Sequence, residues 1–259
     1  MKIEVIRYPG KILSPIRLEE LINELRLVAS TCFSDVPNYQ ILSGEKDDCD
    51  RAIVSIARNH KGEILGFCSA LILPLSKSEK FFHTGLTCVR PSARGLKLTH
   101  KLTSKVLITY IIRESLFKKV WVSNCACVLA SIGNVAKHFD DVYPSPYFND
   151  VPKPKHKAIA RKISESYREQ IAINKTAVYN SQKFVFEGSV SNSEFQKEST
   201  DSRFYHRDQR LTEYYKKLLN FERGDEIVQV ASCSLLTFPR YFFKRFKLNK
   251  KKQLSVSHA

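Results

Sequence analysis

The residues with the clearest chemical meaning lie in one segment, Thr87–Leu102, where a strand pattern runs into a helix pattern through Pro91 and Gly95. A strand that enters a helix through a short glycine-containing loop leaves the first backbone N–H groups of that helix without partners. The helix dipole adds partial positive charge at the same end. The segment therefore predicts an anion-binding site at the start of the helix.

Five cationic side chains accompany this loop, with no acid among residues 90–105: Arg90, Arg94, Lys97, Lys101 and Lys105. A ligand that carries a pyrophosphate suits this combination of positive charge and free N–H groups. The alternative is that Gly95 serves an ordinary turn before a helix. The strands expected before the loop, and the Ser-Asn strand expected after it, favour the anion site.

The sequence Val89-Arg-Pro-Ser-Ala-Arg-Gly95 resembles the V-x-P-x-x-R-G entry to the acetyl-CoA loop of the GNAT (Gcn5-related) N-acetyltransferases. That family's loop follows R/Q-x-x-G-x-G/A. Here Lys97 stands in place of its glycine and Thr99 in place of its final small residue. Trp121-Val-Ser-Asn124 and the helix near Ser131–Phe139 resemble the family's splayed fifth strand and the helix after it. The resemblance spans about residues 50–145 and identifies a divergent member.

This resemblance implies that acetyl-CoA is the co-substrate and that its acetyl group passes directly to an amine acceptor, without a covalent enzyme intermediate. The residues implied to bind the cofactor are Cys88, Val89, Arg90, Arg94, Gly95, Leu96, Lys97, Leu98, Thr99, Asn124 and Ser131. Backbone groups of Cys88 and Val89 would polarise the acyl carbonyl and hold the pantetheine arm. The Lys97 side chain either obstructs the cofactor, leaving a pseudo-enzyme, or turns outward to contact a phosphate. For Asn124, the alternative is a helix cap or turn residue.

Direct transfer also needs a group that accepts the amine proton and a group that protonates the departing thiolate. The resembled family often has a glutamate on the strand before the loop, but Phe81–Val89 contains none, so His83 is the candidate base. The family's tyrosine is missing from the later part of the helix 126–139, so Tyr143 is the candidate acid. The alternatives are a hydrogen-bonded structural histidine and a tyrosine that packs against a proline-rich segment.

The seven cysteines are odd in number and scattered, which argues against a secreted disulfide framework. A reducing cytoplasmic compartment fits better, with the nucleus as the alternative. Cys125-Ala-Cys127 has no CxxC partner elsewhere, so no metal site is expected. Neither thiol has a histidine at a recognisable catalytic spacing, so a cysteine nucleophile is not expected either.

The chain of 259 residues carries a formal net charge of +16, and most of the excess lies after residue 150. This charge serves solubility alone or attracts a polyanion. A second function class is therefore a non-catalytic GNAT-like protein whose basic C-terminal half binds nucleic acid or an anionic membrane. The longest nearly apolar run, Val106–Ile112, is far shorter than the about 20 residues of a membrane-spanning helix. No transmembrane segment is therefore expected.

Periodicity supplies the elements that would position these residues. Alternating or apolar runs predict strands at 2–7, 52–58, 64–73, 81–89, 120–123, 183–187 and 226–233. Rows at helical spacing predict helices at about 16–32, 99–117 and 126–139, with further helices around 159–171 and 211–218. The segments Tyr143–Lys157, with four prolines, and Gly188–Ser202, rich in serine, are expected to be irregular. Three consecutive strands favour an α+β fold over a doubly wound one.

The expected fold is thus α+β, with a mixed, mostly antiparallel central sheet flanked by helices and with extra C-terminal helices and strands. Residues 1–150 are expected to form the acyl-CoA-binding core, and 151–237 to complete the fold on the substrate side. Residues 238–259 form a tail in which aromatic and basic residues alternate. That tail is expected to pack on the core as a closing helix, or else to contact a membrane or nucleic acid. The amine acceptor and the oligomeric state do not follow from the sequence.

Overall fold

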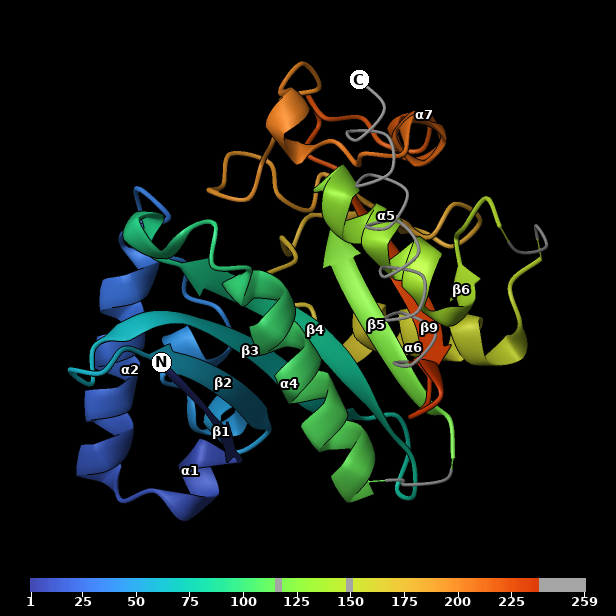
Figure 1. Ribbon diagram of the computed structural model, residues 1–259. Helices are drawn as coiled ribbons and strands as arrows, with labels where there is room; N and C mark the ends of the chain where they lie inside the picture. The colour runs from blue at the N-terminus through green and yellow to red at the C-terminus, as the bar shows by residue number, and fades with distance from the viewer. Residues whose placement is uncertain (115–117, 148–150, 238–259) are drawn as a thin grey trace, which may run out of the picture.

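A computed structural model describes residues 1–114, 118–147 and 151–237, and a nine-stranded sheet runs through it (Figure 1). The predicted tail, 238–259, lies outside these ranges. The strands follow the order β1-β2-β3-β4-β5-β9-β8-β7, and β6 pairs with β9 as well. Their bounds are β1 Lys2–Arg7, β2 Ala52–Arg58, β3 Ile64–Pro74, β4 Lys80–Val89, β5 Val120–Ala126, β6 Asp140–Tyr143, β7 Val178–Asn180, β8 Val185–Glu187 and β9 Glu226–Cys233.

The sheet is antiparallel at every pair of neighbours except β4 and β5, which run parallel. A parallel pair needs a crossover, and the helix that follows the anion loop supplies it. The helices are α1 Pro9–Ile12, α2 Pro15–Ala29, α3 Lys46–Cys49, α4 Leu98–Glu114, α5 Leu129–His138, α6 Pro154–Ser166 and α7 Gln209–Lys216. The predicted α+β class with a mixed, mostly antiparallel sheet is confirmed.

Helices cover both faces of the sheet (Figure 1). On one face, α4 packs across β1 to β4, and its predicted row Leu98, Leu102, Val106 and Tyr110 is fully buried there. On the other face, α2 and α6 contribute Leu21, Leu25, Ile159 and Ile163 to a second core. Helices α5 and α7 pack against each other beside β8 and β9. Strands from both sides of residue 150 thus share one sheet.

The proline-rich segment is more regular than predicted. Strand β6 extends to Tyr143, and α6 begins at Pro154. A proline is tolerated at the first helical position because the N–H that it lacks would have no partner there. The segment Gly188–Ser202 does consist of turns, but its first residues are not an exposed loop, since Ser189 and Val190 are both buried.

Burial of the α4 row predicts a large stability cost when it is truncated. Leu102 is 0% exposed between the helix and the sheet. Leu102→Ala is expected to lower the free energy of unfolding by about 2–5 kcal/mol, because the removed atoms leave a cavity. Lys105→Ala, on the exposed side of the same helix, is the control and should change it by less than about 0.5 kcal/mol. Urea unfolding measures both, and equal effects would contradict the packing of α4 on the sheet.

Candidate active site

The site begins where β4 and β5 separate. Their parallel ladder contains only two residue pairs, Phe82 with Val122 and His83 with Ser123. Beyond these pairs the side chain of Thr84 is the link, since its hydroxyl lies 3.2 Å from the carbonyl oxygen of Ser123 and 2.9 Å from Oδ1 of Asn124. The remainder of β4 then runs on toward the anion loop without pairing to β5 in the described chain.

A bulge in β4 follows this separation. Cys68 of β3 pairs with Thr87 and Ala70 pairs with Thr84, so Gly85 and Leu86 both stand opposite Ser69. Such a bulge bends the strand and increases its local twist. A Cβ on Gly85 would lie only 2.0 Å from Oε1 of Gln40, so this position has room for glycine alone unless Gln40 moves.

The loop after β4 has the backbone conformation of an anion cradle. Gly95 and Lys97 have φ angles of 92° and 57°, both in the left-handed region. The backbone N–H groups of Gly95, Lys97, Leu98 and Thr99 donate no hydrogen bond within the described ranges. The start of the 17-residue helix α4 therefore presents free donors and the positive end of its dipole.

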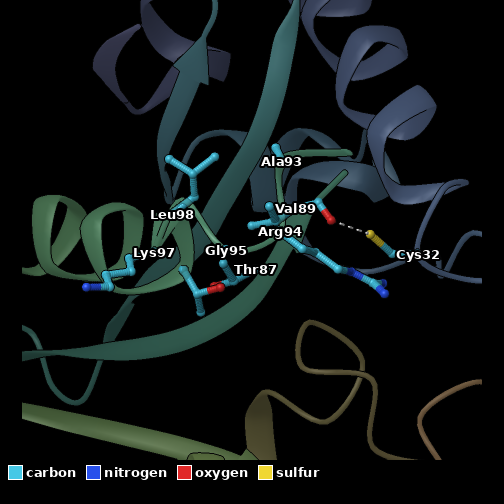
Figure 2. Close-up of a pocket in the computed structure, with 9 residues that line it drawn as sticks. Cys32, Thr87, Val89, Ala93, Arg94, Gly95, Lys97 and Leu98 are labelled. Atoms are coloured by element: carbon cyan, nitrogen blue, oxygen red, sulfur yellow. Dashed lines mark hydrogen bonds between the residues drawn. The ribbon is translucent and has the colours of Figure 1, made fainter. Parts of the chain in front are cut away.

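A pocket of about 320 Å³ lies against this loop, and Figure 2 shows its lining. The lining residues are Cys32, Thr87, Val89, Ala93, Arg94, Gly95, Lys97, Leu98 and Thr99. The side chains of Arg94 and Lys97 extend in opposite directions from the loop (Figure 2). Cys32 comes from the segment after α2, and its thiol donates a 3.5 Å hydrogen bond to the carbonyl of Val89.

The cations of the loop have no acidic partners within the structure. Arg94, Lys97, Lys101 and Lys105 are exposed, and none forms an ion pair with a described residue. Arg90 differs, because its Nε donates to the carbonyl of Ile64 at 2.8 Å. Arg90 therefore anchors the turn to β3, while the other four cations are available to an anion.

The pocket brings together six of the eleven predicted cofactor residues, namely Val89, Arg94, Gly95, Lys97, Leu98 and Thr99. Five do not line it: Cys88, Arg90, Leu96, Asn124 and Ser131. Cys88 is buried in the core on the α2 side, and Leu96 is half exposed at the tip of the loop. Asn124 joins β5 to β4 through Thr84, and Ser131 lies in the first turn of α5. Cys32 also lines the pocket, although nothing in its sequence context signals it.

The prediction that His83 is the base is not supported by its surroundings. The imidazole is 0% exposed, and its Nδ1 lies 2.8 Å from the hydroxyl of Ser123. Burial removes water from the cationic form and lowers the pKa of His83 to about 3. A side chain that binds a proton so weakly is a poor proton acceptor for an amine, and His83 does not line the pocket. The structural alternative describes it better.

The prediction that Tyr143 is the acid meets a similar objection. Tyr143 lies on β6, which β9 and β5 separate from β4. Its ring stacks on His156 at 5.8 Å and meets Phe184 edge-on at 4.7 Å. These ring contacts agree with the packing alternative, and Tyr143 is not among the residues that line the pocket.

Several polar residues that the sequence did not reveal are buried on the face opposite α4, and one of them, Gln40, lies over the bulge. Gln40 and Tyr39 come from the segment before β2, and Glu226 is the first residue of β9. All three are buried, as is Ser189, whose hydroxyl donates to Glu226 at 2.6 Å. In the sequence, Glu226 has the appearance of an ordinary polar residue at the edge of an apolar strand.

The thiols near this group remain protonated at neutral pH. Burial raises the pKa of Cys125, and it raises that of Cys127 to about 12. All seven cysteines are free thiols. Over the residues that the structure describes, no three His, Cys, Asp or Glu side chains gather as a metal-binding set. In the same ranges, no helix combines the length and apolar character needed to cross a bilayer.

Comparison with known proteins gives matches at the level of structure only. No protein-family model matches the sequence, and no curated protein does. Gcn5 of Tetrahymena is similar at 14% identity and a TM-score of 0.40, over 59% of this chain and 91% of that one. An acetyltransferase of the GNAT family from Staphylococcus aureus is similar at 19% identity and a TM-score of 0.32, over 47% and 72%.

An acetyltransferase from Vibrio fischeri is similar at 15% identity and a TM-score of 0.31, over 47% of this chain and 94% of that one. These matches include the family that the loop sequence resembles. A likeness at such identities concerns the fold, so the activity has to be derived from the chain's own site.

The left-handed conformation of Lys97 gives a test of the loop. A non-glycine residue in the left-handed backbone region is destabilised by about 1–2 kcal/mol. Lys97→Gly should therefore be more stable than Lys97→Ala by about 1 kcal/mol. At Lys101, inside α4, the order should reverse by a similar amount, because glycine disfavours a helix interior. Chemical denaturation of the four variants measures this, and the same order at both positions would contradict the loop conformation.

The buried His83 predicts a loss of stability in mild acid. In the unfolded chain the His83 imidazole binds a proton below its ordinary pKa of 6.5. In the folded chain it stays neutral until the pH falls to about 3. His83 should therefore make the protein about 2 kcal/mol less stable at pH 5 than at pH 7. Urea unfolding of wild type and His83→Gln at both pH values isolates this contribution. An unchanged pH dependence in the variant would show that His83 is protonated in the folded state.

Proposed function

We propose that the protein is an acyl-CoA-dependent N-acyltransferase that uses acetyl-CoA and transfers the acetyl group directly to an amine. The observation that carries this proposal is the loop Arg94–Thr99. It combines four unbonded N–H groups, two left-handed residues and unpaired cations around one pocket. A pyrophosphate needs all three features, and the pocket volume lies in the range of ligand sites, roughly 300–1,000 Å³.

The pantetheine arm would run from this loop along β4 toward the point where β5 separates from it. Val89 and Thr87 line the pocket on that side, and the bulge at Gly85 lies further along the same strand. A strand edge without a neighbouring strand has free backbone N–H and C=O groups. An extended ligand can form hydrogen bonds with them in the way that an added strand would. The amides of the pantetheine arm suit such an edge, and the thioester would then lie near the bulge.

Lys97 supports binding rather than obstruction. Its φ of 57° gives the loop the left-handed turn that glycine usually supplies, and its side chain points away from Arg94 (Figure 2). The ammonium group is exposed and has no acidic partner in the described chain, so it can act as a point charge on a phosphate. We therefore propose an active cofactor site rather than a pseudo-enzyme.

The alternative function, polyanion binding by the basic C-terminal half, gains less support. Several cations of that half already pair with acids, among them Lys153 with Asp141, Lys155 with Glu79, and Arg223 with Glu187 and Asp225. Surface pairs of this kind reduce the net positive field that a polyanion would meet. The part of the prediction that concerns the tail lies outside the described residues.

Acetyl-CoA is expected to raise the melting temperature of the protein, because it binds the folded state alone. At 100 times its dissociation constant the gain is about 2.7 kcal/mol. Arg94→Ala should weaken binding by roughly 1.5–3 kcal/mol through loss of a charge-assisted hydrogen bond. Lys175→Ala, an exposed cation before β7 at the far edge of the sheet, is the control. Calorimetric titration measures the affinities, and higher salt should lower them.

The absence of any thermal shift at millimolar acetyl-CoA would contradict the proposed function. Equal losses in Arg94→Ala and Lys175→Ala would instead show that binding follows net charge rather than the loop.

A further inference from the structure

The acyl transfer proposed above needs a proton acceptor for the amine, and neither His83 nor the thiols supply one. Two acids near Tyr39 are buried on the face opposite α4, Asp48 of α3 and Glu226 at the start of β9. Asp48 accepts a hydrogen bond from Ser43 at 2.8 Å and has the cation of Arg51 nearby, whereas Glu226 has no such cation.

Glu226 is 7% exposed and lies on the same face as Tyr39 and Cys125. Its negative charge helps to raise the pKa values of both of these residues. A catalytic role for Glu226 rests on the proposed function.

The carboxyl of Glu226 has no cationic partner among the described residues. Its hydrogen bond comes from the hydroxyl of Ser189, at 2.6 Å. The titratable groups that face it are Tyr39 from the segment before β2, and Cys125 and Cys127 from β5 and its end. All three are neutral at pH 7 because burial raises their pKa values. Burial likewise raises the pKa of Glu226 to about 7, while the Ser189 bond opposes that rise.

Neighbouring residues lead from Glu226 to the bulge in β4. Glu226 and Cys127 stand next to the last pair of the β5–β9 ladder, Ala126 with Ile227. The Cys127 thiol donates to the carbonyl oxygen of Phe195 at 3.2 Å, and the ring of Phe195 meets that of Tyr39.

Tyr39, which Glu226 faces, accepts a hydrogen bond from Nε2 of Gln40 at 3.1 Å. The Gln40 amide in turn accepts from Ser69 at 2.8 Å and lies directly over Gly85. This series of neighbours runs from Glu226 through Tyr39 and Gln40 to Gly85, which lies on the part of β4 that does not pair with β5.

Three aromatic rings form a wall on the face of the sheet opposite α4. Phe195 meets Phe33 edge-on at 5.8 Å and Tyr39 edge-on at 5.7 Å. Phe33 and Phe195 are half-buried, and Phe33 follows Cys32, which lines the cofactor pocket. Ring faces attract ammonium groups, and a nearby carboxylate strengthens that attraction. A primary amine with an apolar body suits this surface.

We propose that Glu226 accepts the proton of the acceptor amine, which binds as an ammonium ion between the carboxylate and the wall of Phe33, Tyr39 and Phe195. The ammonium gives one proton to Glu226, and the freed lone pair forms the C–N bond to the thioester carbonyl. The C–S bond breaks, and the thiolate leaves as free CoA thiol with a second proton from the nitrogen. Glu226 then releases its proton to water, so the products are an amide, CoA and one proton.

The test measures release of CoA thiol from acetyl-CoA with three primary amines: 2-phenylethylamine, spermidine and a tripeptide with a free N-terminus. In wild type, kcat should rise as pH increases through about 7, because only the carboxylate accepts a proton. Glu226→Gln should lower kcat by about 10²-fold or more and remove this rise, with acetyl-CoA affinity unchanged. Glu187→Gln, an acid on β8 paired with Arg223, is the matched control and should behave as wild type.

Ser189→Ala gives a second, independent readout. Its hydroxyl stabilises the carboxylate, so its removal should move the rise in kcat to higher pH while the rate at high pH remains. A purely structural role for Ser189 would lower the rate at every pH and leave the profile in place. Folding is checked by melting at pH 8, where Glu226→Gln should be at least as stable as wild type because it buries no charge.

Each remaining outcome has a defined meaning. Full activity of Glu226→Gln with an unchanged pH profile would overturn the role of Glu226. Binding of acetyl-CoA without faster thiol release from any of the three amines would overturn the acceptor site, while the cofactor site stands. A failure of wild type to bind acetyl-CoA would overturn the proposed function itself.

Discussion

The short contact between β4 and β5 is the constraint on which the rest of the site depends. Two residue pairs hold these parallel strands together, and the side chain of Thr84 forms the last link to β5. Because pairing stops there, the backbone of β4 stays available on the way to the loop, and α4 starts where that backbone ends. Gln40, which bonds to Tyr39, lies over Gly85 on that same part of β4. The proposed cofactor pocket and the proposed acceptor surface thus both adjoin the stretch of β4 that does not pair with β5.

The local parts of this arrangement could be predicted from the sequence. The strands 2–7, 52–58 and 226–233 coincide with β1, β2 and β9, and the row from Leu98 to Tyr110 is buried, because burial on one face imposes periodicity. What depends on pairing between distant segments could not be predicted. Glu226 looks exposed until β9 is known to lie between β5 and β8. His83 resembles a catalytic residue until its complete burial is known.

Left-handed residues and buried polar atoms without partners occur in several parts of the described chain, and some of them belong to the site. Gln40 and Lys97 adopt left-handed backbone conformations, and the Nε2 of His83 and the Nδ2 of Asn124 are buried without hydrogen-bond partners among the described residues. A buried polar atom without a partner costs roughly 1–3 kcal/mol. Strained backbone and unpaired buried atoms remain only where the surrounding structure holds them in place, and they are common at binding and catalytic sites. The Nε2 of His83 and the Nδ2 of Asn124 belong to residues at the point where β4 and β5 separate.

The position of β9 has a consequence for the order in which the protein acquires its shape during synthesis. This strand is the last one described, yet it pairs with β5 about a hundred residues earlier and carries Glu226. A nascent chain that lacks it exposes the edge of β5 and has no Glu226. Contacts between segments so far apart form slowly, because a long loop must close first. The loop Arg94–Thr99, built from neighbouring residues, can thus form on the ribosome before the proposed acceptor surface exists, and the proposed transfer has to wait until β9 has been made.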